Sequence, residues 1–405
     1  MQFWSYVFLV SCFLVFYNYA GYALIVLLVN KFAGKKTAAP DDGTGFFPSV
    51  SFIVAAYNEE DCIEQKITNS LDLDYPREKI EFLFVSDGSD DRTAALVREH
   101  PLVRSLHQPE RRGKSAALNR AVEQARNEVL IFSDANTVLN KEAIRHIARH
   151  YADPGTGGVA GEKKVLPDPS GTNEVGTGEG LYWKYESFLK KTDSAFYSVV
   201  GAAGELFSFR SALYEPIPDN VILDDFVSSL KVAQRGYRIV YEPDAYAMEL
   251  PSFSMQDEKK RKIRIAAGGF QAIGLLAPLL TFKYPRLSFL YISHRVFRWA
   301  LSPFCLVLAF ISNAILVLGS ASPPFGLPSR PPFTIFFLGQ LCFYGMAITV
   351  SLLPSLSQRS RIAKLAYYFT FMNVCAILGF FRFLRGNQKA VWEKARRAQA
   401  TPLES

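Results

Sequence analysis

The amino-terminal stretch of the chain, residues 3–29, contains no charged side chain. It is longer than the roughly 20 apolar residues that a helix needs to cross a bilayer. It lacks the basic start and the small-residue cleavage site of a secretory signal, so we expect it to be retained as a membrane anchor. Lys31, Lys35 and Lys36 follow directly. Because basic residues flank the cytoplasmic ends of spans, they predict that the next domain faces the cytoplasm.

Three more apolar blocks lie near the other end of the chain, at residues 297–318, 333–353 and 365–381. Most of the charge lies between the first block and these three, within residues 31–264, which have the composition of a soluble domain. We therefore predict an integral, multi-pass protein of the cytoplasmic (inner) membrane, with a large domain inserted between membrane helices.

Composition limits the partners of this chain. Its five cysteines form no CxxC pair, so neither a disulfide framework nor a zinc site is indicated. The net charge is +7, and the basic residues lie beside the apolar blocks rather than on an isolated helix. This distribution favours the lipid bilayer and phosphate-bearing substrates as partners over nucleic acid.

A pattern of strand, polar loop and helix repeats in the first part of the large domain. Short apolar runs predict strands at residues 50–56, 80–85, 103–107 and 129–132, and helical spacing predicts helices at 60–71 and 115–125. Such alternation is typical of parallel strands joined by crossover helices. Polar residues follow each strand, and the carboxyl ends of parallel strands share one edge of a sheet, where ligands bind.

The last of these strands is followed by Asp134 and Asn136. Two oxygen donors at this spacing suit a divalent cation that carries a phosphate. Asp and Asn also form turns, so the pair is a metal site only if the rest of the site supports it.

Several motifs, in this order, resemble those of family 2 glycosyltransferases. They are IVAAYNEE at 53–60, VSDGS at 85–89, RGKSAALN at 112–119, FSDAN at 132–136, LDD at 223–225, RGYR at 235–238 and YEPDA at 241–245. Over about residues 50–270 the chain is similar to the membrane-integrated branch that includes cellulose, hyaluronan and poly-N-acetylglucosamine synthases. The resemblance implies an α/β fold: a GT-A-type nucleotide-sugar-binding domain with a mostly parallel twisted sheet and helices on both faces, inserted between transmembrane helices.

The resemblance and the apolar blocks together divide the chain into six parts. These are an anchor at 1–30, a linker at 31–48, a cytoplasmic glycosyltransferase domain at 49–255, an interfacial amphipathic segment at 256–290, transmembrane helices at 291–385 and a basic tail at 386–405.

The family implies an inverting, metal-dependent hexosyltransferase of exopolysaccharide biosynthesis, with Mg²⁺ or Mn²⁺ as cofactor. It would move a sugar from a UDP-sugar to a growing polysaccharide or lipid-linked glycan at the cytoplasmic membrane face, with or without translocation. A homo-oligomer or polysaccharide-export partners would fit this activity. The alternatives are single-sugar transfer and a non-catalytic, nucleotide-sugar-binding scaffold. A dinucleotide-dependent dehydrogenase is disfavoured because no GxGxxG follows the first strand.

The resemblance assigns donor binding to residues along the strand ends. These are Tyr57, Glu59, Asp87, Lys114, Asp134 and Arg264, with Asp134 and Asn136 as metal ligands. Asp87 would accept the uracil imide N–H, although Asp-Gly is also a common turn. Lys114 at a helix start would add charge to the phosphates, although such a lysine is often only solvated. Asn136 stands where the family usually has an acid, so we expect weaker metal binding.

Asp225, with Asp224 beside it, is the predicted catalytic base. Adjacent carboxylates in a cleft raise each other's pKa, which lets one accept a proton near neutral pH. The pair also precedes a predicted helix at 226–233 and could simply complement its N-terminus.

Acceptor contacts are assigned by the resemblance to Gly204, Phe207 and Arg261. The run RKIRI at 261–265 stands where the synthases carry Gln-x-x-Arg-Trp. Ile265 thus replaces the tryptophan on which the acceptor sugar rests, which leaves processive polymerisation open. The aromatic residues Tyr182, Trp183 and Tyr185 would either stack on sugars or belong to the core.

The topology of the membrane half contains a conflict. We expect residues 265–282 to be interfacial and the Pro-rich loop at 320–332 to lie outside. Four single spans then put the tail outside, whereas Arg382, Arg385 and the basic residues after them predict that it is inside. A re-entrant 365–381, a spanning 265–282, or a tail that breaks the charge rule would resolve it.

Overall fold

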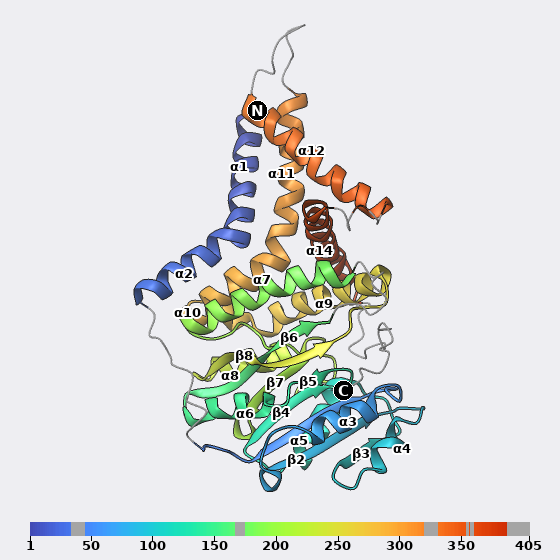
Figure 1. The fold of residues 1–405 in the computed structure, drawn as a ribbon. Helices are drawn as coiled ribbons and strands as arrows, with labels where there is room; N and C mark the ends of the chain where they lie inside the picture. Colours follow the sequence, from blue (N-terminus) through green and yellow to red (C-terminus); the bar gives the residue numbers. More distant parts are fainter. Residues whose placement is uncertain (34–44, 167–174, 320–330, 354–355, 357–359, 387–405) are drawn as a thin grey trace.

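The computed structural model describes residues 1–33, 45–166, 175–319, 331–353, 356 and 360–386. Most of the predicted linker, nearly all of the loop at 320–332 and all of the basic tail except Gly386 lie outside the described residues. A sheet with its covering helices forms one end of the molecule, long helices form the other, and a layer of crosswise helices lies between them (Figure 1).

The large domain is built on one eight-stranded sheet, in the order β3-β2-β1-β4-β7-β6-β8-β5. The strands are β1 (Val50–Ala56), β2 (Ile80–Asp87), β3 (Arg104–Gln108), β4 (Val129–Asp134), β5 (Val138–Leu139), β6 (Thr156–Val165), β7 (Leu206–Arg210) and β8 (Arg238–Glu249). The first four are parallel, β7 runs antiparallel to β4 and β6, and β8 pairs parallel with β6. The predicted α/β fold of GT-A type is confirmed, and the sheet is mixed, with its antiparallel pairs at β7 and β5.

Strand β1 is buried along its whole length because apolar side chains cover both faces of the sheet. The covering helices are α3 (Ile63–Leu71), α4 (Thr93–Arg98), α5 (Lys114–Gln124), α6 (Ala143–Ala148) and α8 (Asp224–Gln234). Short 3₁₀ turns lie at Arg77–Lys79, Arg149–Ala152, Ser211–Leu213 and Ala277–Leu280. The four strands and two helices that the sequence predicts within residues 50–132 are all present. Their observed boundaries differ from the predicted ones by up to three residues.

The middle layer joins the sheet domain to the long helices. It contains α2 (Tyr22–Ala33), α7 (Val175–Phe196), α9 (Met255–Leu275), α10 (Pro285–Leu290) and the π-helix η7 (Tyr291–Leu301). The hydroxyl of Tyr22 donates to Asp193 at 2.6 Å, and the amide of Asn30 donates to the carbonyl of Thr192 at 2.9 Å. These bonds attach the amino-terminal helix to α7.

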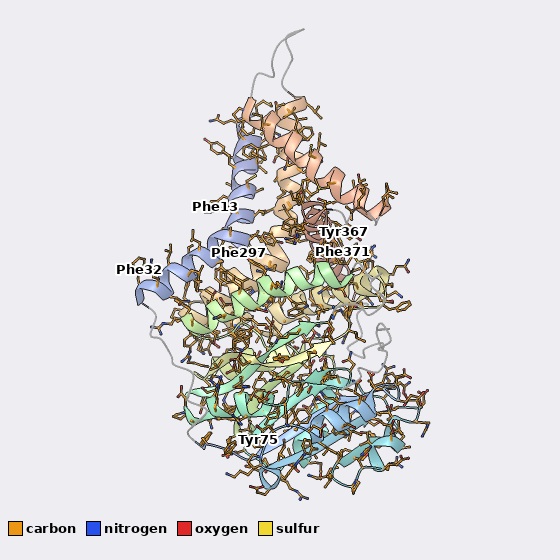
Figure 2. All side chains as sticks on the ribbon, in the orientation of Figure 1. Phe13, Phe32, Tyr75, Phe297, Tyr367 and Phe371 are labelled. Atoms are coloured by element: carbon orange, nitrogen blue, oxygen red, sulfur yellow. The ribbon has the colours of Figure 1, made fainter. Side chains whose placement is uncertain are left out.

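Four helical stretches of the described residues are long and apolar enough to cross a membrane: Gln2–Phe32, Pro285–Leu318, Pro332–Leu352 and Arg361–Leu384. They comprise α1 (Gln2–Phe16) continued through η1 (Tyr17–Gly21) into α2, α10 continued through η7 into α11 (Ser302–Leu318), α12 (Pro331–Leu352) and α14 (Arg361–Leu384). Phe13 and Phe32 are exposed, as expected of side chains that face lipid (Figure 2).

Helix α14 packs lengthwise on α9. Near its start, the Tyr368 hydroxyl lies 3.4 Å from Glu258 of α9, and near its end Phe383 stacks on Phe270 at 6.2 Å. Between these contacts, a Cβ on Gly379 would come within 2.5 Å of Ala266, so only glycine permits this approach. The two helices therefore run side by side over most of the length of α9.

Candidate active site

The centre of the candidate site is an ion pair at the strand ends. Lys114 begins α5, and its Nζ lies 2.5 Å from Oδ1 of Asp134 at the end of β4. Burial by itself lowers the pKa of Lys114, but the carboxylates of Asp134, Asp224 and Asp225 outweigh it and raise the pKa. The ammonium therefore stays charged and available to an anionic ligand.

Asp87 fixes the loop that delivers Lys114. It is fully buried at the end of β2, where its Oδ1 accepts from the backbone N–H of Arg112 at 3.2 Å and its Oδ2 from that of Gly113 at 2.6 Å. Gly113 has a φ of +102°, which turns the chain into α5 and favours glycine. The sequence did not predict this positioning contact, and the predicted uracil contact would have to use the remaining lone pairs of a carboxylate that is already engaged.

Asp224 and Asp225 occupy the first turn of α8. Burial and the neighbouring charge of Asp224 raise the pKa of Asp225 to about 7, against the opposing effect of Lys114. A Cβ built on Gly204 would lie 3.2 Å from Nζ of Lys114 and 3.4 Å from Oδ2 of Asp225, so both side chains converge on this glycine. The structure thus brings together the predicted base, the predicted cation and the predicted acceptor glycine.

Helix α9 contributes Arg264 and Arg261. Burial lowers the pKa of Arg264, while the charges of Asp224, Asp225 and Asp134 raise it. Arg261 instead lies 2.9 Å from Glu258. We call Asp134, Asp224 and Asp225 the acidic cluster. Of the two arginines, Arg264 is the one whose pKa these carboxylates raise.

The loop after β1 is tied to the loop after β2. The Asn58 amide donates to Asp90 at 2.6 Å, and the backbone N–H of Glu59 donates to the Thr93 hydroxyl at 2.8 Å. The Arg111 guanidinium lies 3.6 Å from the centroid of the Tyr57 ring. Tyr57 and Glu59 thus belong to one connected rim beside α5.

The structure places Phe207, to which the resemblance assigned an acceptor contact, in the core of the sheet domain. Phe207 lies on β7, is buried, and stacks on Phe132 with the ring centroids 4.8 Å apart. The run LFSFR forms a strand of the central sheet, so its aromatic side chains fill the core.

Asp134 and Asn136 provide the oxygen donors of the predicted metal site. Both side chains are half-buried and follow one strand. Among the described residues, no group of three or more His, Cys, Asp or Glu could hold a metal ion by itself. One carboxylate and one amide suit a cation that also binds substrate phosphates, which is how Mg²⁺ is commonly held.

Lys66 is a site residue that the sequence did not reveal. It lies on the buried face of α3, and its Nζ donates to Oγ of Ser133 at 2.7 Å and to the carbonyl of Thr137 at 2.9 Å. Burial lowers its pKa to about 7, although Asp134 raises it. Lys66 therefore connects both ends of the loop that carries Asp134 and Asn136. In the sequence, only the position of Lys66 beside Ile63 and Ile67 on a predicted helix could have indicated that it is buried.

The first prediction concerns this lysine. Lys66→Met should raise the Mn²⁺ concentration needed for half-maximal donor cleavage by about tenfold, because it leaves the buried oxygens of Ser133 and Thr137 without their hydrogen-bond donor, at a cost of about 1–3 kcal/mol. The exposed Lys141, just beyond the same loop, provides the control Lys141→Met. Equal Mn²⁺ dependence in both variants would contradict the positioning role.

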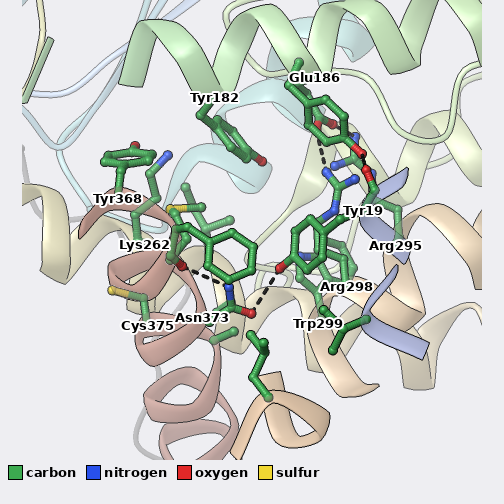
Figure 3. A pocket seen from close by; sticks show the side chains of 18 of the residues that line it. Tyr19, Tyr182, Glu186, Lys262, Arg295, Arg298, Trp299, Tyr368, Asn373 and Cys375 are labelled. Carbon is green, nitrogen blue, oxygen red and sulfur yellow. Dashed lines mark hydrogen bonds and ion pairs between the residues drawn. The ribbon is translucent and has the colours of Figure 1, made fainter. Parts of the chain in front are cut away.

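A cavity of about 1200 Å³ adjoins the acidic cluster. It extends from residues 201–205 and Asp225 to the long helices, and Ile265 lines it. Aromatic rings from other elements also line it, among them Trp183 of α7 and Trp299 of η7. Figure 3 shows Arg295, Arg298 and Glu186 on one wall and Lys262 on another. The sequence did not predict these charged wall residues.

Both sequence comparisons find glycosyltransferases similar to this chain. Residues 51–216 match the profile described as Glycosyl transferase family 2. Poly-beta-1,6-N-acetyl-D-glucosamine synthase of Staphylococcus aureus is 27% identical over 280 residues, which are 67% of each chain. The enzyme of the same name from Staphylococcus epidermidis is 26% identical over 231 residues, 55% of each chain.

A solved structure shares the fold over nearly the whole chain. The mannosyltransferase PcManGT from Pyrobaculum calidifontis, solved with GDP-Man and Mn²⁺, superposes with a TM-score of 0.70 at 23% identity. The alignment covers 93% of this chain and 99% of that one, including the helices beyond the sheet domain. The profile match thus shows a glycosyl transferase family 2 domain at residues 51–216, and the solved structure shows the fold of the chain.

Proposed function

We propose that the chain transfers a hexose, with inversion, from a UDP-sugar to a glycan or lipid-linked acceptor at the membrane surface. The single observation that carries this proposal is the position of Asp225. Its carboxyl has a pKa of about 7, it converges with Lys114 on Gly204, and it lines the cavity that leads to the membrane helices. A base, a cation for phosphate and an acceptor chamber therefore meet at one point.

In the proposed reaction, an acceptor hydroxyl attacks the anomeric carbon of the donor sugar. Asp225 takes the hydroxyl proton as the new glycosidic bond forms, and the bond from the anomeric carbon to the diphosphate breaks. The electron pair leaves with the diphosphate, whose charge Lys114 and Arg264 balance. The displacement on the face opposite the leaving group inverts the anomeric centre.

Asp134 and Asn136 are the residues that would hold the divalent cation of this family. Such an ion, when bound, supplies Lewis-acid stabilisation of the departing diphosphate. The Tyr57 ring and the Arg111 guanidinium stack on each other near the ends of β1 and β2. This flat, positively charged surface suits the base and ribose of the donor. We propose that the base of the donor is uracil.

The decisive experiment measures UDP release by the purified full chain in lipid nanodiscs. A panel of UDP-sugars should include one donor that releases UDP with Mn²⁺ and not with excess EDTA, and product analysis should show the sugar on an acceptor. If no UDP-sugar is cleaved while GDP-mannose is, the donor assignment fails. If no nucleotide sugar is cleaved, the non-catalytic scaffold is favoured.

The pKa of Asp225 predicts the pH dependence of the reaction. Below about pH 7 its carboxyl is protonated and cannot accept a proton, so kcat/KM should rise with pH through about 7. Asp224→Asn removes the neighbouring negative charge that raises this pKa, so the rise should move to lower pH. A profile that is identical in both proteins would contradict the assignment of Asp225.

The packing of α14 on α9 supports a topology with three crossing helices. Arg382, near the end of α14, lies close enough to Arg264 to lower its pKa, so this end is on the side of the acidic cluster. We therefore propose that the helices carrying α1, α11 and α12 cross the bilayer. Helix α14 and the start of the tail would then remain on the cytoplasmic side with the catalytic domain, as the basic residues predict.

A further inference from the structure

Lys114 is paired with the one carboxylate that the predicted metal site contains. Its Nζ lies 2.5 Å from Oδ1 of Asp134, and the two side chains are 23% and 30% exposed. An ion pair that is partly shielded from water is stronger than the same pair at the surface. In the structure, a cation of the protein itself therefore balances the charge of Asp134.

The surrounding residues offer a metal ion little else. Asp134 and Asn136 supply one carboxylate and one amide, and the described residues contain no group of three or more His, Cys, Asp or Glu that could hold a metal ion. The other two carboxylates of the acidic cluster, Asp224 and Asp225, lie on a different element, α8, and they too attract Lys114. A divalent cation that arrives alone thus meets one carboxylate, and Lys114 already neutralises it.

The position of Lys114 gives its ammonium a second place to bind. Lys114 is the first residue of α5, where backbone N–H groups also favour an anion. A Cβ built on Gly204 would lie 3.2 Å from Nζ, so on this side the ammonium faces a residue without a side chain. The four-carbon stem of a lysine is flexible. A diphosphate bound at the start of α5 could therefore draw the ammonium away from Asp134.

We propose that Lys114 keeps the metal site closed until the diphosphate of the donor binds. The ammonium then moves from Asp134 to the phosphate oxygens, and the freed carboxylate holds the divalent cation together with Asn136 and the same phosphates. Ion pairs are exchanged, and no covalent bond changes. The proposal rests on the proposed transferase function and adds an order of binding to it: metal alone binds weakly, and metal binds well only with the diphosphate.

Removal of Lys114 should then affect the two ligands in opposite directions. Without the ammonium, the carboxylate of Asp134 is open to a metal ion, whereas a diphosphate loses one of its positive partners. A lysine that only contacted phosphate would leave the binding of metal alone unchanged, and a lysine that only supported the fold would weaken both. Lys66 does not compete for the metal in this way, because it bonds to Ser133 and Thr137 rather than to Asp134.

Titration of the full chain in lipid nanodiscs with Mn²⁺, followed by electron paramagnetic resonance, measures this competition without nucleotide. Lys114→Met should bind Mn²⁺ about ten- to a hundredfold more tightly than wild type, the gain expected when the metal no longer displaces a charge-assisted hydrogen bond. Lys114→Gln should show the same gain, and Lys114→Arg, which keeps the charge, should show none. At saturating Mn²⁺, Lys114→Met should bind UDP about tenfold more weakly than wild type.

Two further variants identify the source of the gain. Lys141→Met removes the same charge from an exposed side chain just beyond the loop and should leave both affinities unchanged. Asp134→Asn added to Lys114→Met should abolish the gain, because it removes the carboxylate that Lys114 had released. Binding of Mn²⁺ by Lys114→Met and Lys114→Gln that is no tighter than in wild type would overturn the proposal, as would a gain that survives Asp134→Asn. Neither titration contains a donor sugar, so these results are distinct from absent UDP release, which would refute the transferase function instead.

Discussion

Asp225→Asn is expected to abolish sugar transfer while leaving donor binding intact. Asparagine preserves the shape of the side chain but cannot accept the hydroxyl proton, and loss of a general base costs about a hundredfold to ten-thousandfold in rate. Lys114 and Asp134, which carry the proposed phosphate and metal contacts, form their ion pair without Asp225. The change should therefore appear in kcat, with little change in the donor concentration for half-saturation.

The measurement pairs UDP release at saturating donor with direct titration of UDP binding. Asp219→Asn is the control because Asp219 is an aspartate of the segment before α8 whose side chain is 44% exposed in its pair with Arg112. That exposed pair contributes little, so the control should behave as wild type. An Asp225→Asn variant that keeps more than a tenth of wild-type turnover would remove Asp225 from the role of base.

Much of the parallel half of the sheet was predictable because three of its strands, β1, β2 and β4, are short apolar runs closed by a polar loop. Strand β1 occupies residues 50–56 as predicted, and β4 begins at Val129 as predicted. For the antiparallel half of the sheet, the sequence analysis predicted no strand. Strand β6 contains three glycines and two lysines, and a Cβ on Gly158 would come within 2.6 Å of the Ser208 carbonyl, so its composition reflects close packing against β7 rather than strand propensity.

Much of the acidic cluster was also predictable, because its members follow the strand ends in sequence order. Lys114 lies between Asp134 and Asp225 and beside Gly204, so these residues meet at one edge of the sheet as the strand pattern and the family resemblance together led us to expect. Phe207, which the resemblance assigned to the acceptor, is buried on β7 instead. Lys66 could not be foreseen, because a lysine on a predicted helix is normally solvated and the surroundings of Lys66 come from distant segments.

Hydropathy predicted the apolar character of residues 365–381 but not their packing on α9. A bilayer and the surface of another helix offer a similar apolar environment, so composition alone does not predict which of the two a helix contacts. The contact between α14 and α9 depends on Gly379 and the small side chains of Ala266 and Ala267, which allow the two backbones to approach. Sequence position gave no indication that these residues, over a hundred positions apart, would meet.

Glu186→Gln is expected to destabilise the joint between the catalytic domain and the membrane helices. Glu186 is 1% exposed, and its carboxylate is the partner that Arg295 and Arg298 share. Glutamine keeps the volume but removes the charge, which leaves two buried guanidinium groups without compensation. Loss of one partner from a buried ion pair costs about 3–5 kcal/mol.

The thermal midpoint of the full chain in detergent measures this loss, with Glu215→Gln as the control. Glu215 also faces two cations, Lys231 at 4.0 Å and Arg235 at 3.7 Å, but its side chain is 50% exposed, so its removal should cost less than about 1 kcal/mol. Adding Arg298→Met to Glu186→Gln should recover part of the stability, because it removes one of the uncompensated charges. Equal midpoints for the two single variants would mean that water reaches the cavity wall and screens it.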